Sequence, residues 1–299
     1  MAKETPRADI AERVSRVAGR KPVAWTQVER GYTPAERWVV RFEDGSTAFA
    51  KVGVNDLTAG WLRAEHVVYS QLGGDFLPRF LGWDDDGAAP ILLLEDLSAA
   101  EWPPPWSGAR VDAVLEALGA MRAAQPPKDL PSLEAWRDDL TNWWRVAEEP
   151  GPFLSLGLCS ENWLEAASPI LMAAEKGAVL EGDQLLHLDV RSDNICFAGR
   201  RSVLVDWNHA SVGNARLDVV AWMPSLHAEG GPDPISLVSG DSELIAMVAG
   251  YFAHRAGLPP LEGAPGVRGV QLSQLRSALP WVARALGLPP PDGSLPFLR

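Results

Sequence analysis

Cysteine is scarce in this sequence, which narrows the class of protein. The 299 residues include only Cys159 and Cys196, with no CxxC motif and no Cys/His cluster. Neither a disulfide framework nor a structural zinc site is therefore expected, and both thiols are predicted to be buried and reduced. His209, His227 and His254 likewise lack metal-ligand spacing.

Long apolar runs are also missing. The apolar residues 91–94 are followed at once by Glu95 and Asp96, whereas a membrane span needs roughly 20 apolar residues. Residues 1–20 are charged throughout and contain no apolar signal region. We therefore expect no membrane partner and a cytoplasmic location.

Basic residues are outnumbered by acidic ones. The chain has 27 Lys and Arg against 39 Asp and Glu, a formal net charge of −12. A nucleic-acid partner is excluded, because phosphate binding depends on clustered basic residues. The acidity favours a cationic substrate only weakly, since a solvated acidic surface that aids solubility is the simpler explanation. The oligomeric state is not indicated.

The proline-rich stretch EWPPPWSG divides the chain into two parts. We predict an N-terminal lobe over 1–97, a connector over 98–107 and a C-terminal lobe over 108–299. In the first part, apolar runs at 38–42 and 47–52 flank the turn signal EDGS and predict a hairpin. A helix is expected over 55–72, and residues 91–97 predict a buried strand.

The second part is expected to be mainly helical. Apolar residues at helical spacing predict helices over 111–124, 133–149, 161–177, 242–257 and 270–287. Two short apolar segments, LLHLDV and SVLVDW, interrupt this pattern and are each followed by polar residues. The overall expectation is an α+β fold with two lobes, the smaller containing a sheet and one helix.

Acidic and amide side chains lie at the ends of these two apolar segments, or just after them, at a distinctive spacing. Asp189 and Asn194 are five residues apart, and Asp206 ends the second segment twelve residues later. In kinases, this spacing places a carboxylate near the attacking hydroxyl and two oxygen ligands on Mg²⁺. Singly, each residue is more often a turn former or a helix cap than a metal ligand; together they indicate phosphoryl transfer.

The segments HLDVRSDN and VLVDWNHASVGNARLDVVAW resemble the aminoglycoside phosphotransferase (choline kinase-like) family, which is related in fold to protein kinases. The resemblance extends over nearly the whole chain and implies a two-lobed kinase-like fold. It assigns Asp189 as the catalytic base, Arg191 as a cation near the γ-phosphate, and Asn194 and Asp206 as magnesium ligands. His187 and Asp218 would support the catalytic loop.

The same resemblance assigns nucleotide-binding residues in the first part. Lys51 in TAFAKV would bind phosphate, with Glu65 on the following helix as its ion-pair partner. The turn ERGYTPAERW would cover the phosphates through Gly31. The backbone from Glu95 to Leu97 would form the hinge that pairs with the purine.

The sequence departs from the family pattern at residue 188. Many members have glycine there, whereas this chain has Leu188. Because leucine disfavours left-handed backbone, we expect a different loop conformation at this position.

The expected function is magnesium-dependent transfer of the γ-phosphoryl group of ATP or GTP to a hydroxyl of a small molecule. A protein acceptor is disfavoured, because residues 206–218 are too few for an activation segment and no APE motif follows. The resemblance leaves the acceptor open between an aminoglycoside-type antibiotic, a sugar, a nucleoside and a choline-like amino alcohol, and we favour antibiotic modification over phosphorylation of a metabolite. A catalytically silent nucleotide-binding module is the alternative from another class.

Overall fold

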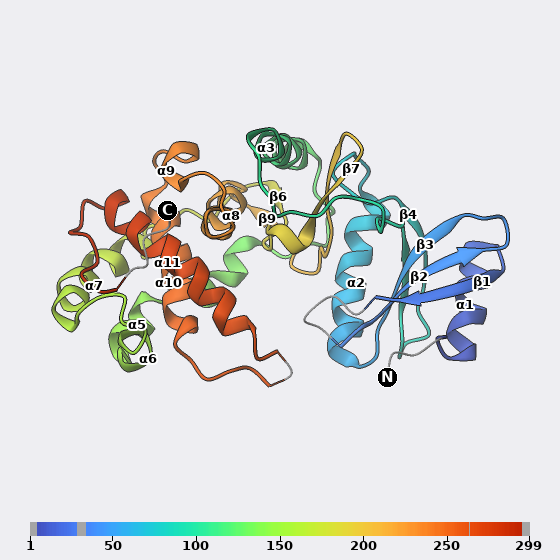
Figure 1. Ribbon diagram of the computed structural model, residues 1–299, viewed down its shortest axis with the longest axis horizontal. Helices are drawn as coiled ribbons and strands as arrows, with labels where there is room; N and C mark the ends of the chain where they lie inside the picture. The colour runs from blue at the N-terminus through green and yellow to red at the C-terminus, as the bar shows by residue number, and fades with distance from the viewer. Residues whose placement is uncertain (1–4, 29–33, 263, 295–299) are drawn as a thin grey trace.

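The protein folds into two lobes (Figure 1). The computed structural model describes residues 5–28, 34–262 and 264–294. A small lobe built on an antiparallel sheet is joined to a larger, mainly helical lobe, which confirms the expected α+β kinase-like architecture. Among the described residues, no helix is both long and apolar enough to cross a membrane.

The small lobe contains a five-stranded antiparallel sheet in the order β1-β2-β3-β5-β4. The expected hairpin is β2 and β3, and its turn is closed by Asp44, whose carboxylate accepts a hydrogen bond from the Ser46 N–H (2.9 Å). The strands are β1 (Pro22–Gln27), β2 (Glu36–Phe42), β3 (Thr47–Val52), β4 (Phe80–Asp84) and β5 (Ile91–Leu94).

Two helices cover opposite faces of this sheet, one more than the sequence predicts (Figure 1). Helix α2 (Asp56–Gln71) is the expected helix and begins with a capping box between Asn55 and Thr58. Helix α1 (Ala8–Ala18) was not predicted, because its charged residues obscure a narrow apolar stripe that includes the fully buried Ile10 and Val14.

The alternation of side chains along β3 turns Lys51 toward α2. Ala48, Ala50 and Val52 pack in the cluster that contains α1, so Lys51 projects from the opposite face. Its partner on β5 is Leu92, which packs with α2 residues. Since both faces are covered, strand β5 is apolar at every position.

The large lobe is mainly helical, but its first half differs from the prediction. The single helix expected over 133–149 is instead a 3₁₀ turn, η1 (Leu133–Trp136), followed by two short helices, α4 (Arg137–Leu140) and α5 (Trp143–Glu148). The other expected helices are α3 (Gly108–Ala123), α7 (Glu161–Lys176), α10 (Ser242–Ala256) and α11 (Val267–Ala285). Helices α6 (Gly151–Leu154), α8 (Arg216–Ala228) and α9 (Pro234–Leu237) were not predicted.

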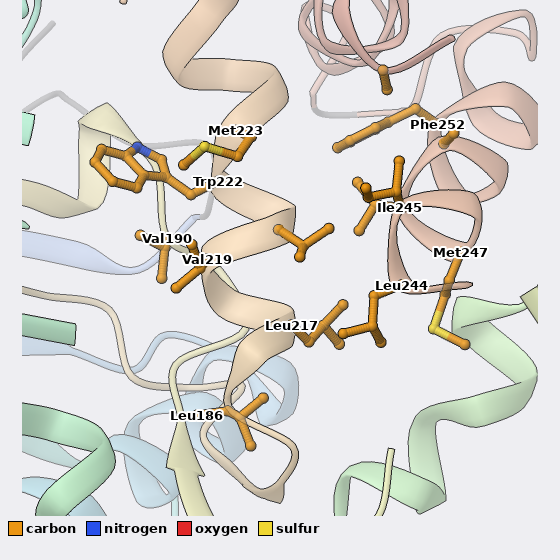
Figure 2. Packing of buried hydrophobic residues seen from close by; sticks show 14 of the residues in the cluster. Leu186, Val190, Leu217, Val219, Trp222, Met223, Leu244, Ile245, Met247 and Phe252 are labelled. Atoms are coloured by element: carbon orange, nitrogen blue, oxygen red, sulfur yellow. The ribbon is translucent and has the colours of Figure 1, made fainter. Parts of the chain in front are cut away.

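Four short strands and a 3₁₀ turn carry the segments that the sequence marks for chemistry. Strand β6 (Gln184–Leu186) pairs with β9 (Ser211–Gly213), and β7 (Ile195–Ala198) pairs with β8 (Arg201–Leu204). The turn η2 (Ser192–Asn194) lies between β6 and β7. Figure 2 shows the apolar core beneath them, where residues of α8 such as Leu217 lie beside Leu244 of α10.

Candidate active site

A buried aspartate fixes the loop that follows β6. The Asp218 carboxylate, at the start of α8, accepts hydrogen bonds from the His187 N–H (2.7 Å) and the Leu188 N–H (2.8 Å). Burial raises the pKa of Asp218 to about 7, although these two donors lower it. Asp218 therefore holds the loop backbone and does not face the solvent.

His187 supports the same loop from beneath. Its ring is fully buried, its Nε2 lies 2.9 Å from the Val205 carbonyl, and its Nδ1 accepts from the Asp189 N–H (3.2 Å). These contacts require a neutral ring protonated on Nε2. Burial lowers the pKa of His187 to about 4, which keeps the ring neutral. His187 thereby connects the loop to the residue that precedes Asp206.

Leu188 adopts the left-handed conformation that the sequence analysis did not expect. Its φ is +61°, so the prediction of a different loop conformation was wrong. The Asp218 hydrogen bond to the Leu188 N–H holds this strained backbone. The leucine side chain packs on the apolar core and lines the cavity beside Asp189.

Asp189 lies on the same loop, and each of its carboxylate oxygens contacts a polar side chain. Asn194 donates its amide to Asp189 Oδ2 (2.8 Å) and to the Asp189 carbonyl (2.9 Å). Arg191 Nε lies 3.1 Å from Asp189 Oδ1 and also pairs with Asp193 (2.7 Å). These contacts orient the carboxylate, which stays partly exposed at the cavity.

Lys51 of the small lobe forms an ion pair with a residue of the large lobe. Its ammonium pairs with Glu65 (2.6 Å) and with Asp206, so the predicted Lys51–Glu65 ion pair is present. Glu65 is 1% exposed and Lys51 6%. Burial disfavours the charged lysine, but the two carboxylates outweigh it and hold the pKa of Lys51 above its ordinary value.

Asp206 provides an oxygen at the mouth of the site. Burial raises the pKa of Asp206, but the positive charge of Lys51 outweighs this effect and holds the pKa below its ordinary value. Asp206 is therefore an anion. Its φ of +70° turns the chain sharply after β8. The Val205 N–H donates to the Asn194 carbonyl (2.9 Å), which brings Asn194 and Asp206 to the same place.

The segment after β5 connects the lobes. The Glu95 side chain, assigned to nucleotide binding from the sequence, accepts from Arg201 Nη1 (3.0 and 3.1 Å) and from the Arg79 N–H (3.0 Å). Leu97 packs with Cys196 and Val203. Among the described residues, neither the Glu95 carbonyl nor the Leu97 N–H has a hydrogen-bond partner. The groups that remain for a ligand are therefore backbone groups.

One predicted residue is not described. Gly31 lies outside the described residues, and its assignment stays a prediction. The structure brings Lys51, Glu65 and Asp206 together and places Asp189, Arg191 and Asn194 on the adjoining loop.

Two features of the site were missed from the sequence. Glu229 accepts from Trp106 Nε1 (2.8 Å) and from the Ser192 hydroxyl (2.6 Å), and so ties the connector to the catalytic loop. A cavity of about 440 Å³ opens beside Asp189 and Arg191 between α4, α8, α10 and α11. Neither has a local sequence signal, because the contributing residues are distant in the chain.

The fold and these contacts define a phosphotransferase of the kinase-like type. The family model described as "Phosphotransferase enzyme family" matches residues 24–261. The chain belongs to this family. No curated protein sequence matches the chain significantly.

Several solved structures share the fold at low sequence identity. A macrolide 2'-phosphotransferase of type I is 15% identical with a TM-score of 0.52, covering 96% of this chain and 95% of its own. A spectinomycin phosphotransferase bound to ADP and spectinomycin is 11% identical with a TM-score of 0.56, covering 85% and 86%. A choline/ethanolamine kinase family protein from Mesorhizobium loti is 12% identical with a TM-score of 0.58, covering 93% and 97%.

Proposed function

We propose that this enzyme transfers the γ-phosphoryl group of ATP or GTP to a hydroxyl of a small molecule in the cytosol. The observation that carries the proposal is that Lys51, Glu65 and Asp206 meet beside a loop that presents Asp189 to a cavity. Phosphoryl transfer depends on positioning and on charge stabilisation, and these residues provide both.

Asp189 is the residue that we assign to the acceptor. Its carboxylate is fixed by Asn194 and Arg191 and borders the cavity through which a hydroxyl would approach. It accepts the hydroxyl proton as the oxygen attacks phosphorus in line. Arg191, which lies beside Asp189 and Asp193, is assigned to offset negative charge on the transferred group.

Lys51, Asp206 and Asn194 are assigned to the nucleotide phosphates. Asp206 and Asn194 provide one carboxylate and one amide oxygen, and the Asn194 amide nitrogen is occupied by Asp189, so its oxygen is the free atom. Two hard oxygen ligands suit Mg²⁺, which otherwise keeps water and phosphate ligands. When bound, Mg²⁺ would neutralise charge on the phosphates. Lys51, steadied by Glu65, binds the same phosphates directly.

The hinge is assigned to the purine. The Glu95 carbonyl and the Leu97 N–H lack partners in the described part of the chain and provide one acceptor and one donor. These two groups can pair with a purine edge, whereas the Glu95 side chain is committed to Arg201. This arrangement supports the backbone role expected for Glu95 and Leu97.

A small acceptor is supported by the solved structures of the same fold, whose names include macrolide, spectinomycin and choline/ethanolamine enzymes. Both antibiotic modification and metabolite phosphorylation are compatible with the site. A silent nucleotide-binding module is the alternative outcome of the test below.

Substitution of Asp189 tests the proposal. We expect Asp189→Asn to lower acceptor-dependent ADP release by about 10²–10⁴-fold, because the base is lost, while the Kd for Mg·ATP changes less than about twofold. Asp206→Ala should instead remove the magnesium-dependent part of ATP binding. The matched control is Asp183→Asn, an exposed residue just before β6.

The outcomes separate the two functions. Full ADP release by Asp189→Asn would remove the assigned base. Stabilisation of the wild-type protein by Mg·ATP without turnover on any hydroxyl compound would favour the silent module.

A further inference from the structure

We infer that the cavity beside Asp189 takes a largely apolar, hydroxylated acceptor with at most one positive charge. The inference rests on the proposed function, since it concerns the acceptor site of that reaction. It also selects among the acceptors that the sequence leaves open, because it disfavours a polycationic aminoglycoside.

The walls of the cavity are mainly apolar. They are formed by Leu217 of α8, by Met247 and Phe252 of α10, by Val270 of α11 and by Leu188 of the catalytic loop. Figure 2 shows Leu217 and Met247 on facing helices, with Phe252 farther along α10. The volume of about 440 Å³ is within the range of pockets that bind drug-sized ligands. Such walls stabilise a ligand by covering apolar surface.

The charges on the walls cancel. Among the described residues, the acids that line the cavity are Asp139 and Asp189, and the arginines are Arg191 and Arg255; His209, counted as neutral in the formal charge, also lines it. Asp189 is already paired with Arg191 (3.1 Å). A polycation would therefore find one carboxylate that is not committed and two cations of its own sign.

Arg255 is fixed at the cavity wall. Its guanidinium lies 3.8 Å from the centre of the Tyr251 ring and donates to the Asp139 carbonyl (3.2 Å) and to Asn142 Oδ1 (3.2 Å). Because these contacts hold the side chain in place, a cationic ligand cannot displace it without breaking them.

Neutral polar groups on α11 complete the site. Gln271 and Gln274 are three residues apart on one face of the helix, and both line the cavity. Gln274 is 7% exposed, and its side-chain amide makes no hydrogen bond to another described residue. Its amide borders the cavity, and a neutral hydroxyl or carbonyl of an acceptor would provide it with a hydrogen-bond partner.

A binding panel tests the acceptor class independently of turnover. The probes are alkyl and aryl glucosides of increasing apolar area, a macrolide, choline and streptomycin, titrated calorimetrically with Mg²⁺ and AMP-PNP present. We expect affinity to rise with apolar area and the best neutral or singly charged probe to bind at least tenfold more tightly than streptomycin.

Gln274→Glu is the matched variant, because it places a charge in the apolar wall without changing its shape. It should weaken the best neutral probe about tenfold or more, whereas Gln125→Glu, at an exposed position, should change nothing. Unchanged AMP-PNP affinity verifies the fold, and Gln274→Leu, which adds no charge, provides a second test of the anchor with a smaller expected loss.

The inference is overturned if affinity rises with positive charge, if no apolar probe binds, or if neither Gln274 variant weakens binding. ADP release measured on the same probes keeps the two proposals apart. Binding of apolar probes without ADP release would overturn the proposed reaction and leave the acceptor class standing.

Discussion

At the residue scale, hydrogen bonds hold the active-site loop in a strained conformation. Leu188 has a φ of +61°, a region in which an L-residue other than glycine, asparagine or aspartate is unfavourable by roughly 1–2 kcal/mol. Asp218 holds the neighbouring N–H groups and His187 the next one. The strain lies at the residue before Asp189, where precise placement of the carboxylate matters most.

Substitutions of Leu188 should therefore reverse the usual order of stability. In an ordinary apolar site, Leu→Ile is milder than Leu→Gly. Here Leu188→Gly relieves the strain, which offsets its lost packing, whereas a β-branched side chain is worse than leucine at positive φ. We expect the free energy of unfolding of Leu188→Ile to be lower than that of Leu188→Gly by about 1 kcal/mol. Urea denaturation measures this, and a more stable isoleucine variant would contradict it.

The sequence predicts the position of a site residue well where that position depends on nearby residues in the chain. Asp189 and Asn194 lie on one loop, and Asp206 lies at the end of the next strand pair, so their spacing in the sequence is informative. The alternation of side chains along β3 places Lys51 on the face that α2 covers, and α2 carries Glu65. The conformation of Leu188 was predicted wrongly, because the preference of leucine against positive φ was given more weight than the hydrogen bonds to Asp218, thirty residues away, that hold this backbone.

At the element scale, the predicted helix boundaries were wrong where a side chain from a distant part of the sequence ends or begins a helix. The helix expected over 133–149 breaks near Asn142, where Glu175 of α7 accepts from the Asn142 N–H (2.9 Å) and the Trp143 N–H (2.7 Å). These bonds cap α5 at its first residues. Apolar spacing alone cannot reveal them, since Glu175 lies more than thirty residues away.

Glu175 should make stability depend on pH. Burial raises the pKa of this carboxyl to about 7 from 4.5, even though the backbone donors lower it. The folded protein thus binds more protons than the unfolded chain between about pH 4.5 and 7, so the free energy of unfolding falls as pH rises through this window, by up to about 3 kcal/mol.

Glu175→Gln removes that titration. At pH 5 the variant should be within about 1 kcal/mol of wild type, because the protonated carboxyl of Glu175 and the amide have nearly the same shape and acceptor capacity. Toward pH 8 the variant should become more stable relative to wild type, because only wild type must then ionise a buried carboxyl. Urea denaturation at several pH values measures it, with exposed Glu165→Gln on the same helix as control. A difference that is constant with pH would show that Glu175 does not titrate in this range.

At the scale of the whole molecule, overall charge and site charge differ. The chain carries −12, yet the charges that line the acceptor cavity cancel. Surface charge is screened over about 8 Å at physiological ionic strength. The net charge is therefore a poor guide to the acceptor, and the cavity walls are the better one.

Arg201 is a second side chain, besides Lys51, that links the two lobes. Arg201 of β8 donates to the Glu95 carboxylate after β5 (3.0 and 3.1 Å), to the Leu77 carbonyl (2.6 Å) and to the Asp75 carbonyl (3.3 Å). It thus connects the catalytic strand pair to the hinge and to the segment between α2 and β4. The hinge position relative to Asp206 depends on this side chain.

We expect Arg201→Ala to lower the free energy of unfolding by about 1–3 kcal/mol, because the partly buried Glu95 carboxylate loses its closer charged partner and keeps only the exposed Arg79 at 3.6 Å. The KM for nucleotide should rise more than kcat falls, since the hinge moves while the Asp189 loop keeps its Asp218 contacts. Urea denaturation and initial-rate kinetics measure both effects, and Arg200→Ala, the exposed neighbouring arginine, is the control. If both alanine variants behave alike, or if Arg201→Ala lowers kcat alone, Arg201 does not hold the hinge.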